Sequence, residues 1–323
     1  MEKITLLDTA VGSTNRGDEI IMKCACEELE YILRKYYTLP IPTHLCAFNV
    51  AECIGPLPDT AAEVASSKYK FVCGTNLLGG KMLNRTNQWD IHLFNSRPLT
   101  NAVLVGVGAE EERADFYTTR LYKKILSREY IHSVRNQKAY DMLTAIGLRC
   151  LNTGCLTMWK LTPDFCRTIP KKKSKAVIFT LTDYRRSPQD DALLIDILRT
   201  NYEKVYFWIQ GIYDLDYLSS ITDISDIVIV QSDLNAYAQV LDREDIDYVG
   251  TRLHAGIFSL RHGVRSIILT VDLRMDSMSS CLPNNCLTRA ELEEGLERKI
   301  HGELETVCRI DWDAVTRWKV QFS

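Results

Sequence analysis

The stretch YVGTRLHAGIFSLRHG, residues Tyr248–Gly263, places an arginine and a histidine two positions apart, where an apolar strand is expected to run into an apolar helix. Side chains such as Arg252 and His254 are rarely buried without a partner. An arginine offers planar N–H donors that suit carboxylate and phosphate groups, and a histidine titrates near neutral pH and can donate a proton. The junction therefore predicts an anion pocket with a proton donor, although a buried structural histidine is the commoner case.

Two other strand ends carry polar side chains that could face the same ligand. In TAVGSTNRGDEIIM, residues Thr9–Met22, a strand is followed by a small polar turn and then by a helix, whose N-terminal N–H groups would attract an anion. Asn15 is a donor in this turn, and Asp18 is either a base or an ordinary helix cap. In VCGTNLLGG, residues Val72–Gly80, Asn76 is the polar side chain best placed to face a cleft.

Two more junctions extend the pattern. In IHSVRNQKAYDML, Ser133 and Arg135 come where a strand passes into a helix. Arg135 suits carboxylate or phosphate, although an isolated arginine more often makes a surface salt bridge. In FTLTDYRRSPQDD, Asp183 follows the first strand of the second half of the chain. Ligands of open α/β sheets bind outside the carboxyl ends of the strands, so we expect these side chains to face one cleft.

Short apolar, β-rich runs alternate with amphipathic segments along the chain, which predicts an α/β fold with parallel strands. The first half has strand patterns at KITLLD, YKFVCGT and NAVLVGVG, and the alternation begins again at AVIFTLTD. Between the halves, TPDFCRTIPKKKSK (Thr162–Lys175) breaks the alternation with two prolines and a cluster of charges, as expected of a linker. We therefore predict two Rossmann-like domains facing a cleft, over residues 1–165 and 175–305.

Residues 306–323 carry Trp312, Trp318 and Phe322 beside basic side chains. A helix of this composition either packs back on the first domain or contacts a membrane surface, and we expect packing, the commoner arrangement for a terminal helix. No apolar run approaches the about 18–20 residues that span a bilayer, and the start of the chain is too polar for a signal peptide. The sequence predicts a cytoplasmic protein, with at most a peripheral contact at the inner membrane face.

Composition argues against several classes of protein. The net charge is −3 and there is no basic stripe, so no nucleic-acid partner is expected. Eleven cysteines are scattered without a C-x-x-C pair or zinc spacing, which indicates a reducing compartment and predicts no metal site. The chain lacks a Walker loop, a G-x-G-x-x-G fingerprint and a G-x-S-x-G elbow. Its Asp-x-Asp pairs, among them Asp214/Asp216, occur at a frequency near chance.

Several motifs follow one another over about residues 5–275: STNRGDEIIM, GTNLLGG, SVRN…AYDMLTAIG, NTGCLTMW, TLTDY, FWIQG, DYVGTRLHAGI and SIILTVDLR. Through them the chain resembles the polysaccharide pyruvyl transferases. The most specific piece is Gly-x-Arg-x-His followed by an apolar strand and an aspartate. The resemblance implies a GT-B-like fold. It also implies that a pyruvyl group moves from phosphoenolpyruvate to two hydroxyls of a sugar in a capsular or exopolysaccharide precursor, forming a cyclic ketal and releasing phosphate.

The resemblance also implies roles for the candidate side chains. His254 is the expected proton donor, with Asp18 as the second catalytic group. The substrate contacts are expected from Arg135, Arg252, Ser133 and Asp183 for the donor, and from Asn15 and Asn76 for the acceptor. Phosphoenolpyruvate is a co-substrate, no cofactor or metal is expected, and the acceptor would be a lipid-linked saccharide at the cytoplasmic membrane face.

Three departures from the family pattern leave the acceptor open. GTNLLGG stands where many members have three successive glycines, Asn136 stands where an aspartate is usual, and DLRM at residues 272–275 differs from the familiar variants. Two alternatives remain. One is a GT-B glycosyltransferase that uses a nucleotide sugar, since a shared fold does not fix the reaction. The other is a non-catalytic protein that binds a phosphorylated ligand in a polysaccharide assembly complex.

Overall fold

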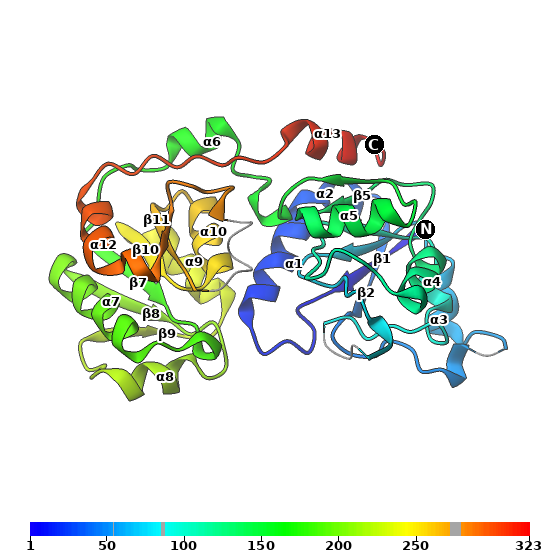
Figure 1. Cartoon of the computed structure of the whole chain (residues 1–323), viewed down its shortest axis with the longest axis horizontal. Helices are drawn as coiled ribbons and strands as arrows, with labels where there is room; N and C mark the ends of the chain where they lie inside the picture. Colours follow the sequence, from blue (N-terminus) through cyan, green and yellow to red (C-terminus); the bar gives the residue numbers. More distant parts are fainter. Residues whose placement is uncertain (54, 85–87, 272–278) are drawn as a thin grey trace. The chain divides into compact units, whose positions relative to one another are not determined.

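The computed structural model of the chain describes residues 1–53, 55–84, 88–271 and 279–323. It divides into two compact units (Figure 1): unit 1 comprises Met1–Ser13, Ile21–Trp159 and Ile310–Ser323, and unit 2 comprises Thr14–Ile20 and Lys160–Arg309. The change of unit after Trp159 lies just before the expected linker. The segment Thr14–Ile20 groups with unit 2, whereas the sequence analysis placed it in the first domain. The altered DLRM motif lies outside the described residues.

Unit 1 is built on a parallel sheet of four strands in the order β2-β1-β3-β4, and two further strands, β5 and β6, pair in parallel beside them. The strands are β1 (Lys3–Asp8), β2 (Tyr37–Pro42), β3 (Lys70–Cys73), β4 (Ala102–Val105), β5 (His132–Val134) and β6 (Cys150–Asn152). The helices are α1 (Arg16–Glu28), which belongs to this unit from Ile21 on, α2 (Glu30–Leu33), α3 (Asp59–Ala65), α4 (Phe116–Ile125), α5 (Gln137–Ala145) and α13 (Trp312–Val320). Strands β3 and β4 are buried on both faces, which explains their apolar runs Phe71–Cys73 and Ala102–Val105.

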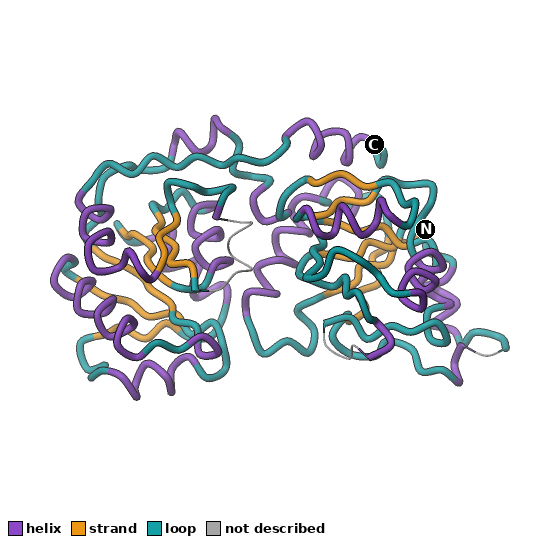
Figure 2. Tube along the Cα trace, viewed as in Figure 1, coloured by secondary structure: helices purple, strands orange, loops and turns teal. Residues whose placement is uncertain are grey.

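Unit 2 has a parallel sheet of six strands in the order β12-β11-β10-β7-β8-β9. The strands are β7 (Ala176–Thr180), β8 (Lys204–Trp208), β9 (Ile227–Val230), β10 (Ile246–Gly250), β11 (Ser266–Thr270) and β12 (Cys286–Thr288). The helices are α6 (Pro163–Thr168), α7 (Pro188–Asn201), α8 (Asp214–Ile221), α9 (Leu234–Arg243), α10 (Leu253–Arg261) and α12 (Leu292–His301). Helices lie on both sides of the strands in each unit (Figure 2). The predicted α/β class with parallel sheets is confirmed.

The strand order of unit 2 reverses at β7. From β7 the chain proceeds outward through β8 and β9, and it then returns to place β10 on the other side of β7. Such a reversal leaves a crevice at the carboxyl ends of the two central strands, because the connections from them run to opposite faces of the sheet. The residues that follow β7 and β10 therefore lie where this fold class binds ligands.

Arg265 is a fully buried arginine that ties several parts of unit 2 together. Its Nη1 donates to Oδ2 of buried Asp247 at 2.8 Å, and Tyr202 donates to the same carboxylate oxygen at 2.8 Å. Its Nη2 donates to the carbonyl oxygens of Ile300 at 3.0 Å and Gly302 at 3.1 Å, at the end of α12. A cation suits a helix C-terminus, where carbonyl groups lack helical partners. The arginine thus fixes the end of α12 against the sheet.

Helix α13 packs on unit 1 through aromatic side chains. Trp318 is fully buried, with its ring 5.5 Å from that of Trp159 and 6.4 Å from that of Phe71. The ring of Phe322 lies 5.1 Å from that of Phe71. Because Trp318 and Phe322 are turned into unit 1, these two rings are not available for the membrane contact that the sequence analysis considered. Within the described residues, no helix has the length and apolar content needed to cross a bilayer.

His132 in β5 is a buried histidine with both ring nitrogens engaged. Nδ1 accepts a hydrogen bond from the Leu104 N–H at 3.2 Å, so Nε2 carries the proton and donates to the Ser127 carbonyl at 2.9 Å. Burial is the main cause that lowers the pKa of His132 from 6.5 to about 4, and the positive charge of Arg149 adds to the effect. The ring is therefore neutral in the folded protein at neutral pH.

We expect this histidine to make the protein less stable in mild acid. As the pH falls below 6.5, the unfolded chain gains a proton at His132 that the folded protein takes up only near pH 4, so up to about 3 kcal/mol of the free energy of unfolding is lost across that window. Urea unfolding at several pH values should show a smaller acid loss for His132→Gln than for the wild type. His301→Gln, a change at an exposed histidine, should keep the full loss, and equal acid losses in all three proteins would refute the assignment.

Candidate active site

Three neighbouring strands of unit 2 bring their carboxyl ends together. Strand β7 pairs with β10 on one side and with β8 on the other. The N–H of Thr251, after β10, donates to the Thr180 carbonyl at 3.0 Å, and the Thr182 hydroxyl donates to the Thr251 carbonyl at 3.0 Å. These bonds continue the sheet beyond its strands, and they fix the start of the segment that carries Arg252.

Arg252 is 3% exposed and is held by three acceptors. Its Nε donates to the Leu181 carbonyl at 2.8 Å, and its Nη2 donates to Oδ1 of Asp183 at 2.8 Å and to Oδ1 of Asp214. Burial opposes the charged guanidinium, but the two carboxylates outweigh it, so the pKa of Arg252 is raised. The ring of Tyr184 lies 5.1 Å from the guanidinium carbon. The arginine is therefore charged and fixed in position.

Gly211, after β8, allows this close packing. A Cβ atom at this position would lie 2.3 Å from Nη2 of Arg252 and 3.0 Å from Oδ1 of Asp214, which is closer than van der Waals contact permits. The N–H of Gly211 also donates to Oδ2 of Asp214 at 2.6 Å. Asp214 thus joins the backbone after β8 to the guanidinium after β10.

The loop before α1 is attached to the same strand end. The carboxamide oxygen of Asn15 accepts from Nε2 of Gln210 at 2.8 Å and from the N–H of Gly17 at 2.9 Å. The N–H of Arg16 donates to the Gln210 carbonyl at 2.9 Å. Gln210 is 3% exposed, and its Oε1 is buried with no hydrogen-bond partner among the residues that the structure describes. Asn15 and Arg252 therefore both lie against the segment that follows β8.

The two predicted catalytic side chains come from the first turns of two helices. His254 lies two residues beyond Arg252, in the first turn of α10, and is partly exposed. Asp18 lies in the first turn of α1, is also partly exposed, and its N–H donates to the Asn15 carbonyl at 3.1 Å. Arg252 is the N-cap residue of α10, but its side chain does not cap the helix. The anchored guanidinium thus fixes the start of the helix that carries His254.

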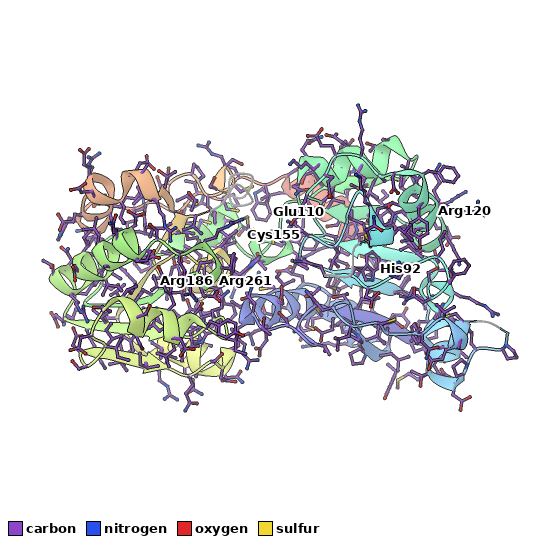
Figure 3. The ribbon with its side chains drawn as sticks, turned by 60° about the horizontal axis from the view of Figure 1, so that its bottom comes forward. His92, Glu110, Arg120, Cys155, Arg186 and Arg261 are labelled. Carbon is purple, nitrogen blue, oxygen red and sulfur yellow. The ribbon has the colours of Figure 1, made fainter. Side chains whose placement is uncertain are left out.

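Arg186, labelled in Figure 3, fixes the turn after β7. Its Nε donates to the Asp183 carbonyl at 2.8 Å, and its guanidinium carbon lies 4.9 Å from the centre of the Tyr217 ring. This exposed arginine therefore holds the backbone of Asp183, whose carboxylate meets Arg252. The predicted donor residue Asp183 thus acts in this structure as a partner of the predicted donor residue Arg252.

Unit 1 contains a second arginine held in the same manner. Arg135, after β5, donates to Oδ1 of Asn76, after β3, from Nη2 at 2.6 Å and from Nε at 3.2 Å. A Cβ atom on Gly108 would lie 2.3 Å from the Asn76 oxygen and 2.7 Å from Nε of Arg135. Nη1 of Arg135 is buried and has no hydrogen-bond partner within the described part of the chain. A buried donor of this kind carries a free-energy cost unless an anion or water binds it.

Ser133 does not have the surface that a direct ligand contact requires. It is completely buried, and its Oγ accepts from the Gly106 N–H at 2.8 Å and shares a 2.6 Å hydrogen bond with the Thr153 hydroxyl. These bonds join the ends of β4, β5 and β6. The structure therefore favours a positioning role for Ser133 over the donor contact expected from the sequence.

Asn136, which replaces the usual aspartate of the family pattern, caps helix α5. Its Oδ1 accepts from the Ala139 N–H at 3.0 Å, as an aspartate would. Its Nδ2 donates to the Ala109 carbonyl at 2.9 Å, a bond that a carboxylate cannot make. The asparagine therefore attaches the start of α5 to the segment after β4.

Two residues at the strand ends around Arg252, Gln210 and Asp214, were not predicted from the sequence. The sequence of the motif FWIQG indicates no role for its glutamine, and Asp214 belongs to one of several Asp-x-Asp pairs whose frequency is near chance. The available signal was their position at the end of a strand next to the point where the sheet order reverses. Among the described residues, no group of three or more His, Cys, Asp and Glu side chains is arranged to hold a metal ion.

The chain resembles known proteins both in sequence and in fold. A family model described as polysaccharide pyruvyl transferase matches residues 15–272. The chain is similar to the UDP-GlcNAc 2-epimerase of Methanocaldococcus jannaschii, with a TM-score of 0.52 and 11% identity over 99% of each chain. It is also similar to S. aureus MnaA solved with UDP, with a TM-score of 0.52 and 10% identity over 100% of this chain and 98% of that one. These likenesses confirm the predicted GT-B-like fold and nothing finer. No curated protein sequence matches the chain.

We expect the two carboxylates beside Arg252 to differ in their effect on stability. The Asp214 side chain is 0% exposed and that of Asp183 is 15% exposed. Removing one partner of a buried ion pair is strongly destabilising, so Asp214→Asn should lower the free energy of unfolding by about 3–5 kcal/mol. Asp183→Asn should lower the free energy of unfolding by only about 1 kcal/mol. Denaturant unfolding gives both values, and hydrogen exchange should locate the loosening in β7 and β10. Equal costs for the two variants would mean that Asp214 is not the main partner of Arg252.

Proposed function

The chain belongs to the polysaccharide pyruvyl transferase family, and on this premise we propose that it transfers a pyruvyl group from phosphoenolpyruvate to two hydroxyls of a saccharide. The observation that carries the proposal is the junction after β10. There a buried arginine, fixed by two carboxylates, begins the helix that bears His254. A proton donor beside a guanidinium that is fixed in position suits a substrate that is an anion and must be protonated on carbon.

The reaction balances as follows. A proton is added to the methylene carbon of phosphoenolpyruvate, which becomes a methyl group and leaves C2 electron-deficient. One sugar hydroxyl forms a bond to C2, and the bond between C2 and the phosphate oxygen breaks. The second hydroxyl then forms the other C2–O bond of the cyclic ketal. The hydroxyls lose two protons, one of which replaces the proton given to the methylene carbon while the other leaves with phosphate.

The proposed roles follow from where each side chain lies. His254 protonates the methylene carbon, and Asp18 accepts a hydroxyl proton. Nε and Nη2 of Arg252 already donate to Leu181, Asp183 and Asp214, and its Nη1 makes no hydrogen bond within the described residues. Nη1 is therefore the group that Arg252 is proposed to offer the donor. The equivalent nitrogen of Arg135 is buried without a described partner, which supports an anion contact there.

The remaining predicted contacts concern the saccharide and the position of Arg252. Asn15 and Asn76 are proposed to bind the saccharide, each with its carboxamide oxygen already oriented by a neighbouring donor. Asp183 is proposed to hold Arg252, which is its contribution to donor binding. We place the acceptor among capsular or exopolysaccharide precursors carried on a lipid at the cytoplasmic membrane face. The acid–base steps above use no metal or cofactor, and phosphoenolpyruvate is a co-substrate.

Calorimetric titration of the purified protein with phosphoenolpyruvate, beside a panel of nucleotide sugars, tests the proposed donor. Binding of phosphoenolpyruvate alone, followed by phosphate release when a saccharide acceptor is added, supports pyruvyl transfer. The Arg252→Ala variant should lose this binding, and its circular dichroism spectrum shows whether the variant is folded. Binding of a nucleotide sugar with no response to phosphoenolpyruvate would replace the proposal with glycosyl transfer.

We expect His254→Ala to lower turnover by about 10²–10⁴-fold, the usual cost of losing a general acid, with little change in phosphoenolpyruvate affinity. His262→Ala is the matched control, because His262 lies at the other end of α10 and is bonded to Asp242 instead. Phosphate release at saturating donor and calorimetric binding measure the two quantities. Turnover that is equal in both histidine variants would remove His254 from the acid role.

A further inference from the structure

Unit 1 carries two adjoining hollows that include none of the residues of the candidate active site. They share Gly147, Leu148 and Arg149, which form the turn between α5 and β6. The first hollow has a volume of about 360 Å³, and the second has a volume of about 430 Å³. Both are within the usual range for small-molecule sites.

The turn that separates the hollows depends on its glycine. Gly147 has a φ of +80°, and a Cβ atom there would meet no other atom within 4 Å, so glycine is favoured by the left-handed backbone alone. The N–H of Gly147 donates to the Thr144 carbonyl and that of Leu148 to the Leu143 carbonyl, both at 3.0 Å, which is a usual way to end a helix. The turn is therefore a rigid ridge between the two hollows.

The first hollow is strongly cationic. Lys123, Arg128 and Arg149 line it. Nη2 of Arg149 donates to the Arg128 carbonyl at 3.1 Å and also to the Glu129 carbonyl, which holds the guanidinium in place. No ion pair involves Lys123, Arg128 or Arg149 within the described residues, and none of the described lining residues is acidic. Three cations that repel one another without a counter-charge are suited to a multiply charged anion.

The second hollow combines apolar and basic side chains. Its apolar wall is formed by Ile131, Tyr140, Leu148 and Leu151, and Arg317 of α13 and the shared Arg149 also line it. The described lining residues of this hollow again include no carboxylate. A cationic hollow that shares a ridge with an apolar one matches a ligand that has an anionic head and an apolar substituent. The anionic head of such a ligand would lie among cations and its substituent would lie among apolar side chains, so no charge would be buried without a partner.

We propose that the two hollows together bind a phosphate group that carries an apolar substituent. The phosphate lies against Lys123, Arg128 and Arg149, and the substituent lies in the hollow lined by Ile131, Tyr140 and Leu151. A phospholipid head group in a membrane and a soluble phosphate ester both present this chemistry. The site is separate from the proposed transfer reaction, so it stands or fails independently of that function.

The test uses the full chain and three probes: inorganic phosphate, hexyl phosphate, and phosphatidylcholine vesicles with or without phosphatidylglycerol. Calorimetry measures the soluble probes and vesicle sedimentation measures the lipid. The double variant Lys123→Gln/Arg149→Gln should weaken binding at least about tenfold, because two charge-assisted contacts are lost. Lys35→Gln/Lys81→Gln removes the same charge from exposed positions of unit 1 that line neither hollow and should bind as the wild type does.

Each outcome decides a separate point. Sedimentation with phosphatidylglycerol vesicles only, lost in the first double variant, identifies a lipid head group, whereas hexyl phosphate binding without vesicle binding identifies a soluble ester. Leu151→Asn should weaken hexyl phosphate binding and leave inorganic phosphate unchanged, which tests the apolar hollow. Arg128→Gln repeats the charge test if the double variant does not fold. No binding of any probe, or equal binding by the two double variants, overturns the proposal.

Discussion

A guanidinium that is removed from water must be matched by acceptors, and the arrangement around Arg252 follows from this requirement. The side chain is 3% exposed, so every strand end near it contributes an acceptor: a carbonyl and Asp183 after β7, and Asp214 after β8. Asp214 is fully buried, and without the guanidinium its charge would be left uncompensated. The ends of three strands are thereby held in one fixed arrangement, and the first turn of α10 starts from it.

Each unit contains an arginine that is held by hydrogen bonds beside a glycine. In each, an arginine after a strand lies against a glycine that has no room for a Cβ atom, Gly211 for Arg252 and Gly108 for Arg135. In each, Nε and Nη2 are engaged while Nη1 makes no hydrogen bond to a described residue. Packing therefore holds each guanidinium in one position. Rigid donors of this kind bind without the entropy loss of ordering a long side chain.

The sequence predicted those features that depend on local pattern. Continuous apolar runs identified buried parallel strands, and the junction containing Arg252 and His254 was located correctly at the end of one of them. Features that depend on partners distant in the chain could not be predicted. Asp214 looked like a chance acidic residue because Arg252, its partner, is 38 residues away. Ser133 looked like a ligand contact because its burial depends on how β4, β5 and β6 meet.

The aromatic cluster of unit 1 has a consequence for how the protein is made. Phe71, Trp159 and Trp318 are in one cluster, yet all of Lys160–Arg309, nearly the whole of unit 2, lies between the second and the third. A ribosome therefore completes almost all of unit 2 before it makes α13. Until then the rings of Phe71 and Trp159 have no cover from Trp318. A nascent chain would thus expose an aromatic surface during the second half of its synthesis, and a chain that ended before α13 would expose it permanently.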